Sequence, residues 1–160
     1  MDGTITILAY AGIVGVALVG GALFGFSAFI MAALARVPDA QGIRAMQQIN
    51  KTVFTPWFMV PFFGTAVLGV AAVVLGLLNT DRGWWFPMAS AGALYALGVF
   101  VVTAAGNVPL NNRLAAVDAD DPKAAELWRR YLVVWTRWNH VRVVASVLAL
   151  IQFAGALRAL

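Results

Sequence analysis

The chain has 160 residues, of which 62% are hydrophobic and only 11% are charged, and its mean hydropathy is +0.84. Soluble globular domains usually have about a quarter of their residues charged, so this composition excludes an ordinary soluble domain. The sequence contains no cysteine, which excludes disulfides and thiolate metal sites. The net charge of +4 could suggest a nucleic-acid partner, but the sequence carries no nucleic-acid-binding motif. We therefore expect no such partner.

Three stretches without a charged side chain are long enough to cross a bilayer, namely residues 3–35, 52–80 and 83–112. Each exceeds the roughly 20 residues that a helix needs to span the hydrocarbon layer. A fourth apolar stretch, residues 132–157, carries Arg137, His140 and Arg142. The sequence therefore predicts an all-α integral membrane four-helix bundle, formed by residues 1–160 as a single domain.

The first stretch has an alternative interpretation as a cleaved signal peptide. Signal peptides place a basic segment before an apolar core of about 7–15 residues. No basic residue precedes residues 3–35, and this stretch is far longer than such a core. We therefore expect it to form the first membrane helix.

Small residues recur at spacings of three and four along the first predicted helix, at Ala17, Gly21, Gly25, Ala28 and Ala32. Dispersion forces, rather than exclusion of water, drive helix packing in lipid, and small side chains allow a close approach. This stripe therefore predicts the face on which the first helix packs against a neighbour.

Residues 38–54 are predicted to form a short amphipathic interfacial helix between spans one and two. Its apolar side chains share one side of the helix, at Ile43, Met46, Ile49, Val53 and Phe54. Such helices lie at the boundary between lipid and water.

Prolines and turn residues predict the boundaries of the remaining spans. Thr55 followed by Pro56 is typical of a helix start, and Pro61 is expected to kink the second span. Pro109 is expected to bend or interrupt the chain after the third span. A turn at residues 118–122 precedes one long final helix, which we expect to run from about Pro122 to the C-terminus.

Basic residues predict the orientation of the bundle. Eight lie in the first and third connections, at Arg36, Arg44, Lys51, Arg113, Lys123, Arg129, Arg130 and Arg137. Only Arg82 and Arg158 lie at the other end, beside an aromatic anchor formed by Trp84, Trp85 and Phe86. Because short cytoplasmic loops are enriched in Lys and Arg, we expect both termini to lie outside.

Uncharged and basic polar side chains form three sets near the cytoplasmic ends of the spans. They are Gln47, Gln48 and Asn50, then Asn107, Asn111 and Asn112, and finally Asn139, His140 and Arg142. At 1.5 Å per residue, Asn107 lies about 33 Å from Trp85, and Arg142 lies about 24 Å from Arg158. These depths are similar, so we predict that the sets meet in the mouth of the bundle.

The amides of the third span favour a buried network over a simple polar exit from the membrane. Asn107 and Asn111 are four residues apart and share one side of a helix. An amide at membrane depth is costly unless it finds hydrogen-bond partners. We therefore expect both amides to face protein or water.

One side of the last helix combines aromatic, amide and guanidinium groups, at Trp135, Trp138, Asn139 and Arg142. A guanidinium beside aromatic planes suits a planar ligand that carries oxygen atoms. The same side chains equally suit a structural network, and Arg142 could instead extend to lipid phosphates. The residue pattern alone leaves these alternatives open.

His140 is the only histidine and cannot form a metal site alone. The sequence shows no paired acids, nucleophile–base pair or phosphate-binding loop. We therefore expect neither a metal nor another cofactor, with axial haem ligation by His140 as the alternative.

Four segments resemble the anthrone oxygenase-like family of small four-span membrane proteins: MQQIN (46–50), PWFMVPFFG (56–64), NVPLNNRL (107–114) and WTRWNHVR (135–142). The resemblance extends in order from about Gly21 to Ser146. It implies a membrane-bound four-helix bundle, in bacteria expected in the inner membrane. Characterised fungal members are associated with oxidation of an anthrone to an anthraquinone by molecular oxygen, without an established metal or flavin. The signature positions implied here are Asn107, Asn111, Trp138, Asn139 and Arg142.

The resulting hypothesis is a cofactor-independent oxygenase that acts on a hydrophobic aromatic small molecule. The predicted catalytic residues are Asn107, Asn139, His140 and Arg142. The predicted substrate-binding residues are Gln48, Asn50, Asn111, Trp135 and Trp138. Arg142 and an amide would stabilise an enolate, and His140 would act as the base.

The alternative is a non-catalytic membrane subunit or a module that binds lipid or a small molecule. Small-residue stripes and an amphipathic helix suit packing against a partner subunit or a second copy of the chain. A transporter or channel is less favoured, since no acidic residue lies inside the spans to couple ions.

Overall fold

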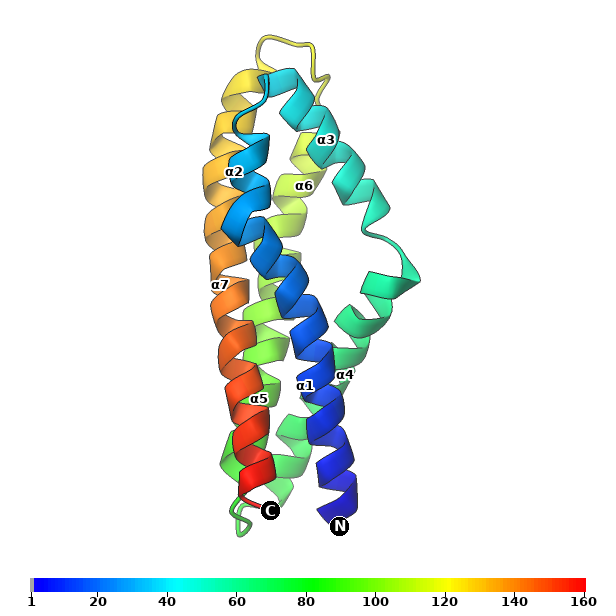
Figure 1. Ribbon diagram of the computed structural model, residues 1–160, viewed down its shortest axis with the longest axis vertical. Helices are drawn as coiled ribbons and strands as arrows, with labels where there is room; N and C mark the ends of the chain where they lie inside the picture. The colour runs from blue at the N-terminus through cyan, green and yellow to red at the C-terminus, as the bar shows by residue number, and fades with distance from the viewer. Residues whose placement is uncertain (1) are drawn as a thin grey trace.

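The computed structural model describes residues 2–160 and is an elongated bundle of helices (Figure 1). Four helices are apolar and long enough to cross a membrane, and they cover Gly3–Leu34, Pro56–Leu78, Trp85–Ala115 and Ala124–Arg158. Within the described residues every regular element is helical. The predicted all-α membrane four-helix architecture is confirmed.

The first span combines α1 (Asp2–Gly25), a π-helical turn η1 (Phe26–Ile30) and α2 (Met31–Leu34). Its predicted stripe of small residues is wrong as the packing face within the chain, because Ala17 and Gly21 are exposed. The close contacts come from other glycines. A Cβ atom on Gly15 would clash with Thr65, and one on Gly20 would lie 2.9 Å from the Cβ of Ser146.

The second span, α4 (Pro56–Leu78), begins where the sequence predicts, with Thr55 extended and Pro56 in the first turn. The helix continues through Pro61. Near its start α4 stands away from the other spans, and the corner between α3 and α4 projects from the side of the bundle (Figure 1). Trp57 at this corner is 92% exposed.

The third span runs from α5 (Trp85–Tyr95) through two π-helical segments, η2 (Ala96–Val101) and η3 (Thr103–Asn107), into α6 (Val108–Ala115). The predicted interruption at Pro109 is wrong. Proline cannot donate a hydrogen bond to the carbonyl four residues before it, but here it lies in the first turn of α6, directly after the wider π-helical turns of η3. The span therefore extends beyond Pro109 to Ala115.

The fourth span, α7 (Ala124–Arg158), is one long helix, as predicted. The turn before it is held by short side-chain caps. Asp118 Oδ1 accepts a hydrogen bond from the Asp120 N–H, and Asp121 Oδ1 accepts one from the Lys123 N–H.

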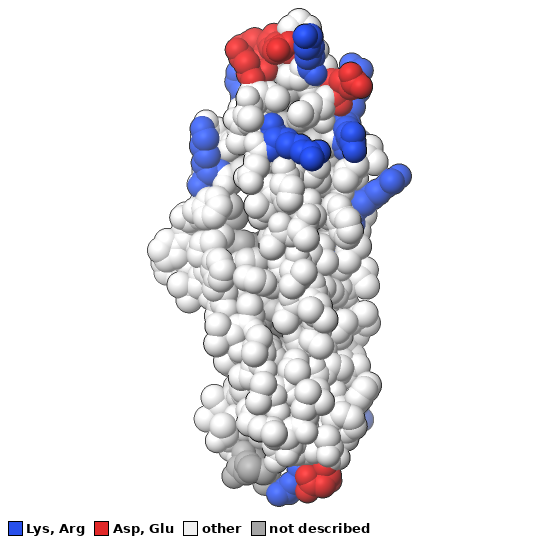
Figure 2. Space-filling model, turned by 180° about the vertical axis from the view of Figure 1, so that it is seen from behind, with Lys and Arg blue, Asp and Glu red and all other residues white. Residues whose placement is uncertain are grey.

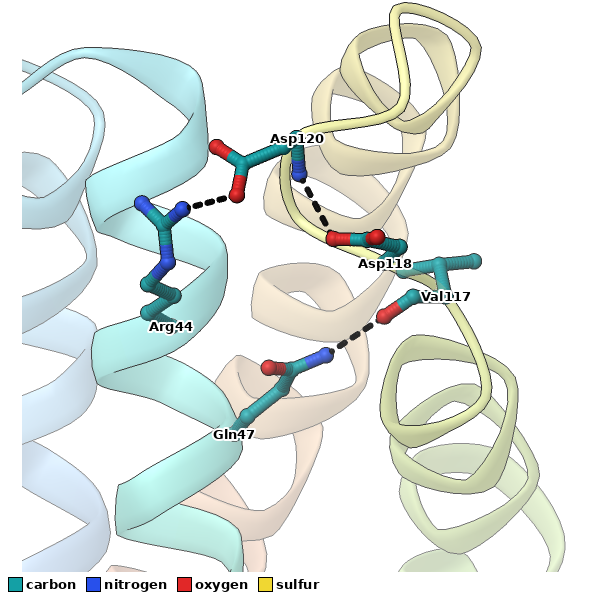
Figure 3. A network of polar contacts seen from close by, with 5 residues as sticks. All are labelled: Arg44, Gln47, Val117, Asp118 and Asp120. Carbon is teal, nitrogen blue, oxygen red and sulfur yellow. Dashed lines mark hydrogen bonds and ion pairs between the residues drawn. The ribbon is translucent and has the colours of Figure 1, made fainter.

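The amphipathic helix α3 (Asp39–Thr52) lies between the first two spans. Its buried side chains, Ile43 and Met46, pack toward α6 and α7. Gln47 donates from Nε2 to the carbonyls of Leu114 (2.9 Å) and Val117 (3.0 Å), and Arg44 pairs with Asp120 (Figure 3). These contacts fasten α3 to the connection between α6 and α7.

The buried side chains form two clusters along the molecule. The membrane core lies between α1, α4, α5 and α7, and its largest members include Phe62, Met88, Tyr95 and Phe153. The head core lies beneath α3 and includes Ile43, Met46, Leu114, Trp128, Tyr131 and Trp135. Helix α7 contributes to both clusters and so connects them.

Both termini lie at the end of the bundle opposite α3 (Figure 1). The connection between α4 and α5 lies at the same end, where a Cβ atom on Gly83 would be 3.2 Å from the Ala159 carbonyl oxygen. Charged side chains gather at the two ends, with many at the α3 end, and leave a broad uncharged belt between them (Figure 2). This belt is the surface that the bilayer covers.

Candidate functional site

A network of polar side chains lies where the membrane core meets the head core, and Arg142 is at its centre. Only 4% of Arg142 is exposed. Its Nη2 donates to Asn139 Oδ1 at 2.6 Å, and its Nη1 donates to Thr103 Oγ1 at 3.1 Å. The guanidinium carbon lies 5.1 Å from the centroid of the Trp135 ring, in reach of a cation–π interaction.

Asn139 joins this network to the first span. It is fully buried, and its Nδ2 donates to the Leu23 carbonyl at 2.8 Å and to Ser27 Oγ at 2.7 Å. Ser27 Oγ also lies 2.9 Å from Nδ1 of His140. Because Ser27 accepts from Asn139, its own hydroxyl hydrogen can be donated to His140. Which of the two atoms donates follows from the tautomer of His140, because the serine oxygen can also accept from both Asn139 and Nδ1–H.

A second branch of the network connects the third span with α7. Asn107 Nδ2 donates to the Trp135 carbonyl at 3.2 Å. Asn111 Oδ1 accepts two hydrogen bonds of 2.8 Å, from the Tyr131 hydroxyl and from Trp135 Nε1. Trp135 is therefore fixed at both its backbone and its ring, directly beneath Arg142.

The π-helical segments hold the residues that meet Arg142 and its neighbours. Ser27 lies in η1, and Thr103 and Asn107 lie in η3. Thr103 Oγ1 donates to the Val99 carbonyl at 2.7 Å, so its oxygen lone pairs remain available to accept from Arg142. Isolated π-helical turns are frequent at functional sites because the extra residue redirects side chains.

Two groups in the network are buried without a hydrogen-bond partner among the described residues, namely Arg142 Nε and Asn107 Oδ1. In addition, no described carboxylate lies within ion-pair distance of Arg142. A buried charge is costly unless it is paired. The site therefore combines a buried unpaired cation and a free N–H donor, which suit an anionic oxygen atom, with a free amide oxygen, which suits a hydroxyl donor.

The depth of the network follows from the length of α7. Arg142 lies about 24 Å from Arg158 along this helix at a rise of 1.5 Å per residue. Since the hydrocarbon layer is about 30 Å thick, the guanidinium lies inside the bilayer, in the leaflet on the α3 side. In this low-dielectric setting electrostatic interactions are stronger than in water.

The structure brings together five of the predicted site residues, Asn107, Asn111, Trp135, Asn139 and Arg142. Trp138 is 42% exposed and packs across Gly106, where an added Cβ atom would lie 2.9 Å from its ring. His140 is exposed and joins the network only through Ser27.

Of the predicted residues of α3, Gln48 lies apart from this network, whereas Asn50 lies beside Tyr131. Gln48 is exposed, and Gln47 instead faces the bundle. Asn50 is partly buried, and its Nδ2 has no hydrogen-bond partner among the described residues. Their assignment to a substrate-binding site stays a prediction.

Sequence reasoning missed Ser27, Thr103 and Tyr131. Serine and threonine are common in membrane helices, so their presence alone indicates no site. Ser27 does stand out as a hydroxyl within an apolar stretch at the depth of Arg142. Tyr131 lies one helical turn from Trp135 on α7, and this spacing could have placed it in the same set.

The described residues contain no group of three or more His, Asp or Glu side chains that could hold a metal ion. The chemistry available at the network is instead hydrogen bonding and positive charge, supplied by a guanidinium, three carboxamides and three hydroxyl groups. Such groups stabilise negative charge on oxygen.

Comparison with known proteins identifies the chain by its family. Residues 54–152 match the family model described as anthrone oxygenase, and this match includes α4, η3 and the part of α7 that carries Arg142. Neither the comparison with curated proteins nor that with solved structures returns a match. The family match covers more than half of the 160 residues, so the chain belongs to the anthrone oxygenase family.

Proposed function

We propose that the protein is a cofactor-independent oxygenase that binds an anthrone- or phenol-type substrate in its ionised form at Arg142. The observation that carries this proposal is the buried guanidinium, which lacks a described carboxylate partner and retains a free Nε–H donor. An oxyanion of the substrate would supply the missing negative charge. Asn107 Oδ1 would accept a hydrogen bond from a neighbouring hydroxyl of the same molecule.

The proposed reaction converts the methylene carbon of an anthrone to a carbonyl. Loss of one proton from this carbon gives an enolate, whose oxygen pairs with Arg142. The enolate carbon passes electrons to O2 and forms a bond to oxygen, and uptake of a proton gives a hydroperoxide. Loss of water then leaves the quinone, so one atom of O2 enters the product and the other leaves as water.

The contribution of the site is to favour the enolate, the electron-rich species that reacts with O2. A preorganised donor in a dry site can contribute a factor of about 10²–10³ to the rate. Trp135, whose ring packs against the guanidinium, would hold Arg142 in position. The role of base falls to His140, which is linked to Asn139 through Ser27.

We further propose that the protein lies in a bacterial inner membrane, with the α3 end in the cytoplasm and both termini outside. The excess of Lys and Arg at the α3 end supports this orientation. A hydrophobic aromatic substrate would then partition into the bilayer and reach Arg142 from the lipid, since the guanidinium lies within the hydrocarbon layer.

A second candidate function is a non-catalytic subunit that binds lipid or a partner helix. The exposed small residues of the first span, including Ala17 and Gly21, support this alternative, as does an apolar groove of about 850 Å³ between α4 and η2. Phe63 and Phe100 lie at this groove. A second copy of the chain or a different membrane subunit could pack there.

The decisive experiment measures anthrone consumption and O2 uptake by the purified full-length protein in lipid nanodiscs. We expect the wild type to exceed the spontaneous rate and Arg142→Gln to lose about 10²–10³ of this acceleration. Arg137→Gln is the matched control, because Arg137 is exposed on the same helix, and we expect it to keep the wild-type rate.

The same samples also separate the oxygenase from a module that binds a phenol without oxidising it. Binding of a phenol can be followed by the absorbance change that accompanies ionisation to the phenolate. Phenolate binding that depends on Arg142, without acceleration of anthrone consumption, would support a binding module. A rate equal to the spontaneous one, together with no phenolate binding, would reject both uses of the site.

A further inference from the structure

A groove with a strongly basic rim lies between α6 and the first turns of α7, outside the Arg142 network. It has a volume of about 310 Å³ and is lined at its rim by Arg113, Lys123, Glu126 and Arg130. Leu110, Leu127 and Tyr131 complete its lining. The groove is therefore large enough for a small ligand group and combines positive charge with apolar contact surface.

The positive charge of this groove is not neutralised within the described part of the chain. Other basic residues of the same end are paired, Arg44 with Asp120 and Arg129 with Asp39. Arg113, Lys123 and Arg130 have no such partner, and Glu126 is the one acid at the rim. The N-terminus of the 35-residue helix α7 adds a partial positive charge at Lys123.

The position of the groove along α7 matches the head-group layer of a bilayer. Arg130 lies about 42 Å from Arg158 along the helix at 1.5 Å per residue. A bilayer is about 40–45 Å thick when its two head-group layers are included. With Arg158 in the head-group layer at the terminal end, Arg130 lies in the head-group layer of the opposite leaflet, where lipid phosphates are found.

We propose that this groove is a binding site for the phosphate head group of an anionic phospholipid. The phosphate would lie among Arg113, Lys123 and Arg130, and the first part of the lipid chains would contact Leu110, which lies on the membrane side of Arg113. Charge complementarity, the apolar lining and the depth of the groove together select a membrane lipid. This site is separate from the proposed oxygenase reaction and does not depend on it.

The groove is connected to the Arg142 network through one residue. Tyr131 lines the groove and donates its hydroxyl to Asn111 Oδ1, which also accepts from Trp135 Nε1. The lipid would therefore cover Tyr131, which is connected through Asn111 to the ring of Trp135 beneath Arg142. Occupation of the groove excludes water from this side of the network.

The test is native mass spectrometry of the full-length protein from detergent micelles, titrated separately with phosphatidylglycerol and with phosphatidylcholine. We expect wild-type protein to retain phosphatidylglycerol in preference to phosphatidylcholine. The double variant Arg113→Gln/Arg130→Gln should bind phosphatidylglycerol about 25-fold more weakly, at about five-fold per basic residue. Glu126→Gln, which removes the acid at the rim, should bind it more tightly.

Arg137→Gln is the control, since Arg137 is exposed on the same helix but does not line the groove. It should retain wild-type affinity for phosphatidylglycerol. The proposal is overturned if wild type shows no preference for the anionic lipid, or if Arg137→Gln loses as much affinity as the double variant. The proposal is also overturned if the double variant and the separate Glu126→Gln variant both bind phosphatidylglycerol as the wild type does.

A further arm separates a lipid from a soluble phosphate. Glycerol 3-phosphate is added as a competitor to protein that carries one phosphatidylglycerol molecule. We expect it to displace the lipid poorly, because it lacks the chains that contact Leu110. Displacement at concentrations equal to those of the lipid would show a soluble-anion site instead and would contradict the proposal. Arg142→Gln should leave lipid retention unchanged, whatever its effect on the oxygenase reaction.

Discussion

The membrane core and the head core are packed in different ways. In the membrane core, helix backbones touch: a Cβ atom on Gly92 would lie 2.1 Å from the Gly69 carbonyl oxygen, across the contact between α4 and α5. In the head core, large rings fill the space, and Trp128, Tyr131 and Trp135 stack along α7 with centroids 5.6 Å and 6.1 Å apart. Close backbone contact at glycine is the feature of the membrane core, and a stack of rings along one helix is the feature of the head core.

The difference reflects the solvent around each region. Lipid tails are as apolar as leucine, so burying a large side chain inside the membrane gains little, and helices associate through close packing of small residues. Around the head core there is water and lipid head groups, so burial of an aromatic ring stabilises the fold directly. Arg142 and its hydrogen-bond partners lie between the membrane core and the head core, and no described carboxylate of either core pairs with Arg142.

The largest expected effect comes from the head core. Trp128→Ala removes a fully buried ring and should lower the free energy of unfolding by about 3–5 kcal/mol. Unfolding in denaturing detergent, followed by circular dichroism, measures this change. Trp57→Ala is the control, because Trp57 is 92% exposed. Equal losses for the two variants would contradict the water-driven packing of the head core.

The next largest effect is expected in the membrane core. Gly92→Ala places a methyl group against the Gly69 carbonyl, so α4 and α5 must move apart, and overpacking of this kind costs about 1–3 kcal/mol. The matched control is Gly21→Ala, which has nothing within 4 Å of the added Cβ atom and should be neutral or slightly stabilising. A destabilisation of the control as large as that of Gly92→Ala would show that close packing is not the cause.

The smallest effect is expected at the surface of the head. Asp120→Asn removes the ion pair with Arg44 that fastens α3 (Figure 3). Both side chains are largely exposed, so the loss should be about 0.5 kcal/mol and should shrink as salt is added. Gln47→Ala, which removes two hydrogen bonds to backbone carbonyls, should cost more. The reverse order would show that charge, and not hydrogen bonding, holds α3 in place.

Much of the fold could be predicted from the sequence because a bilayer imposes a simple length rule. The four spans and the long final helix follow from the positions of charged residues. The depth of Asn107 and of Arg142 could also be predicted, since helical rise converts residue number into distance. Burial of both residues is consistent with the cost of polar groups in lipid.

What could not be predicted is which side of a helix faces a neighbour. Gly12, Gly15 and Gly20 form the close contacts of α1, whereas the exposed Gly21 belongs to the predicted stripe. Both sides of the helix are apolar because one faces lipid and the other faces protein, so periodicity does not distinguish them. Among residues that face water on one side the same reasoning succeeds, as Ile43 and Met46 of α3 show.

The π-helical segments are a second reason why site residues such as Ser27 and Thr103 could not be predicted from the sequence. Each adds a residue to a helical turn, so the side chains that follow it point in other directions than they would in a regular helix. Thr103 and Ser27 therefore reach Arg142 and Asn139 through a geometry that a regular 3.6-residue repeat does not describe. The family match from residue 54 onward also leaves Ser27 and Leu23 outside it, although both contact Asn139.

The depth of Arg142 has an electrical consequence. With Arg158 in the head-group layer, the guanidinium of Arg142 lies roughly two fifths of the way into the hydrocarbon layer from the α3 side, and moving one elementary charge across the full layer corresponds to about 2.3 kcal/mol per 100 mV. An anion that approaches Arg142 from that side therefore crosses part of the transmembrane voltage, and its affinity should change by about 0.9 kcal/mol per 100 mV. A change in the transmembrane voltage would thus change the fraction of protein that carries an anion at Arg142.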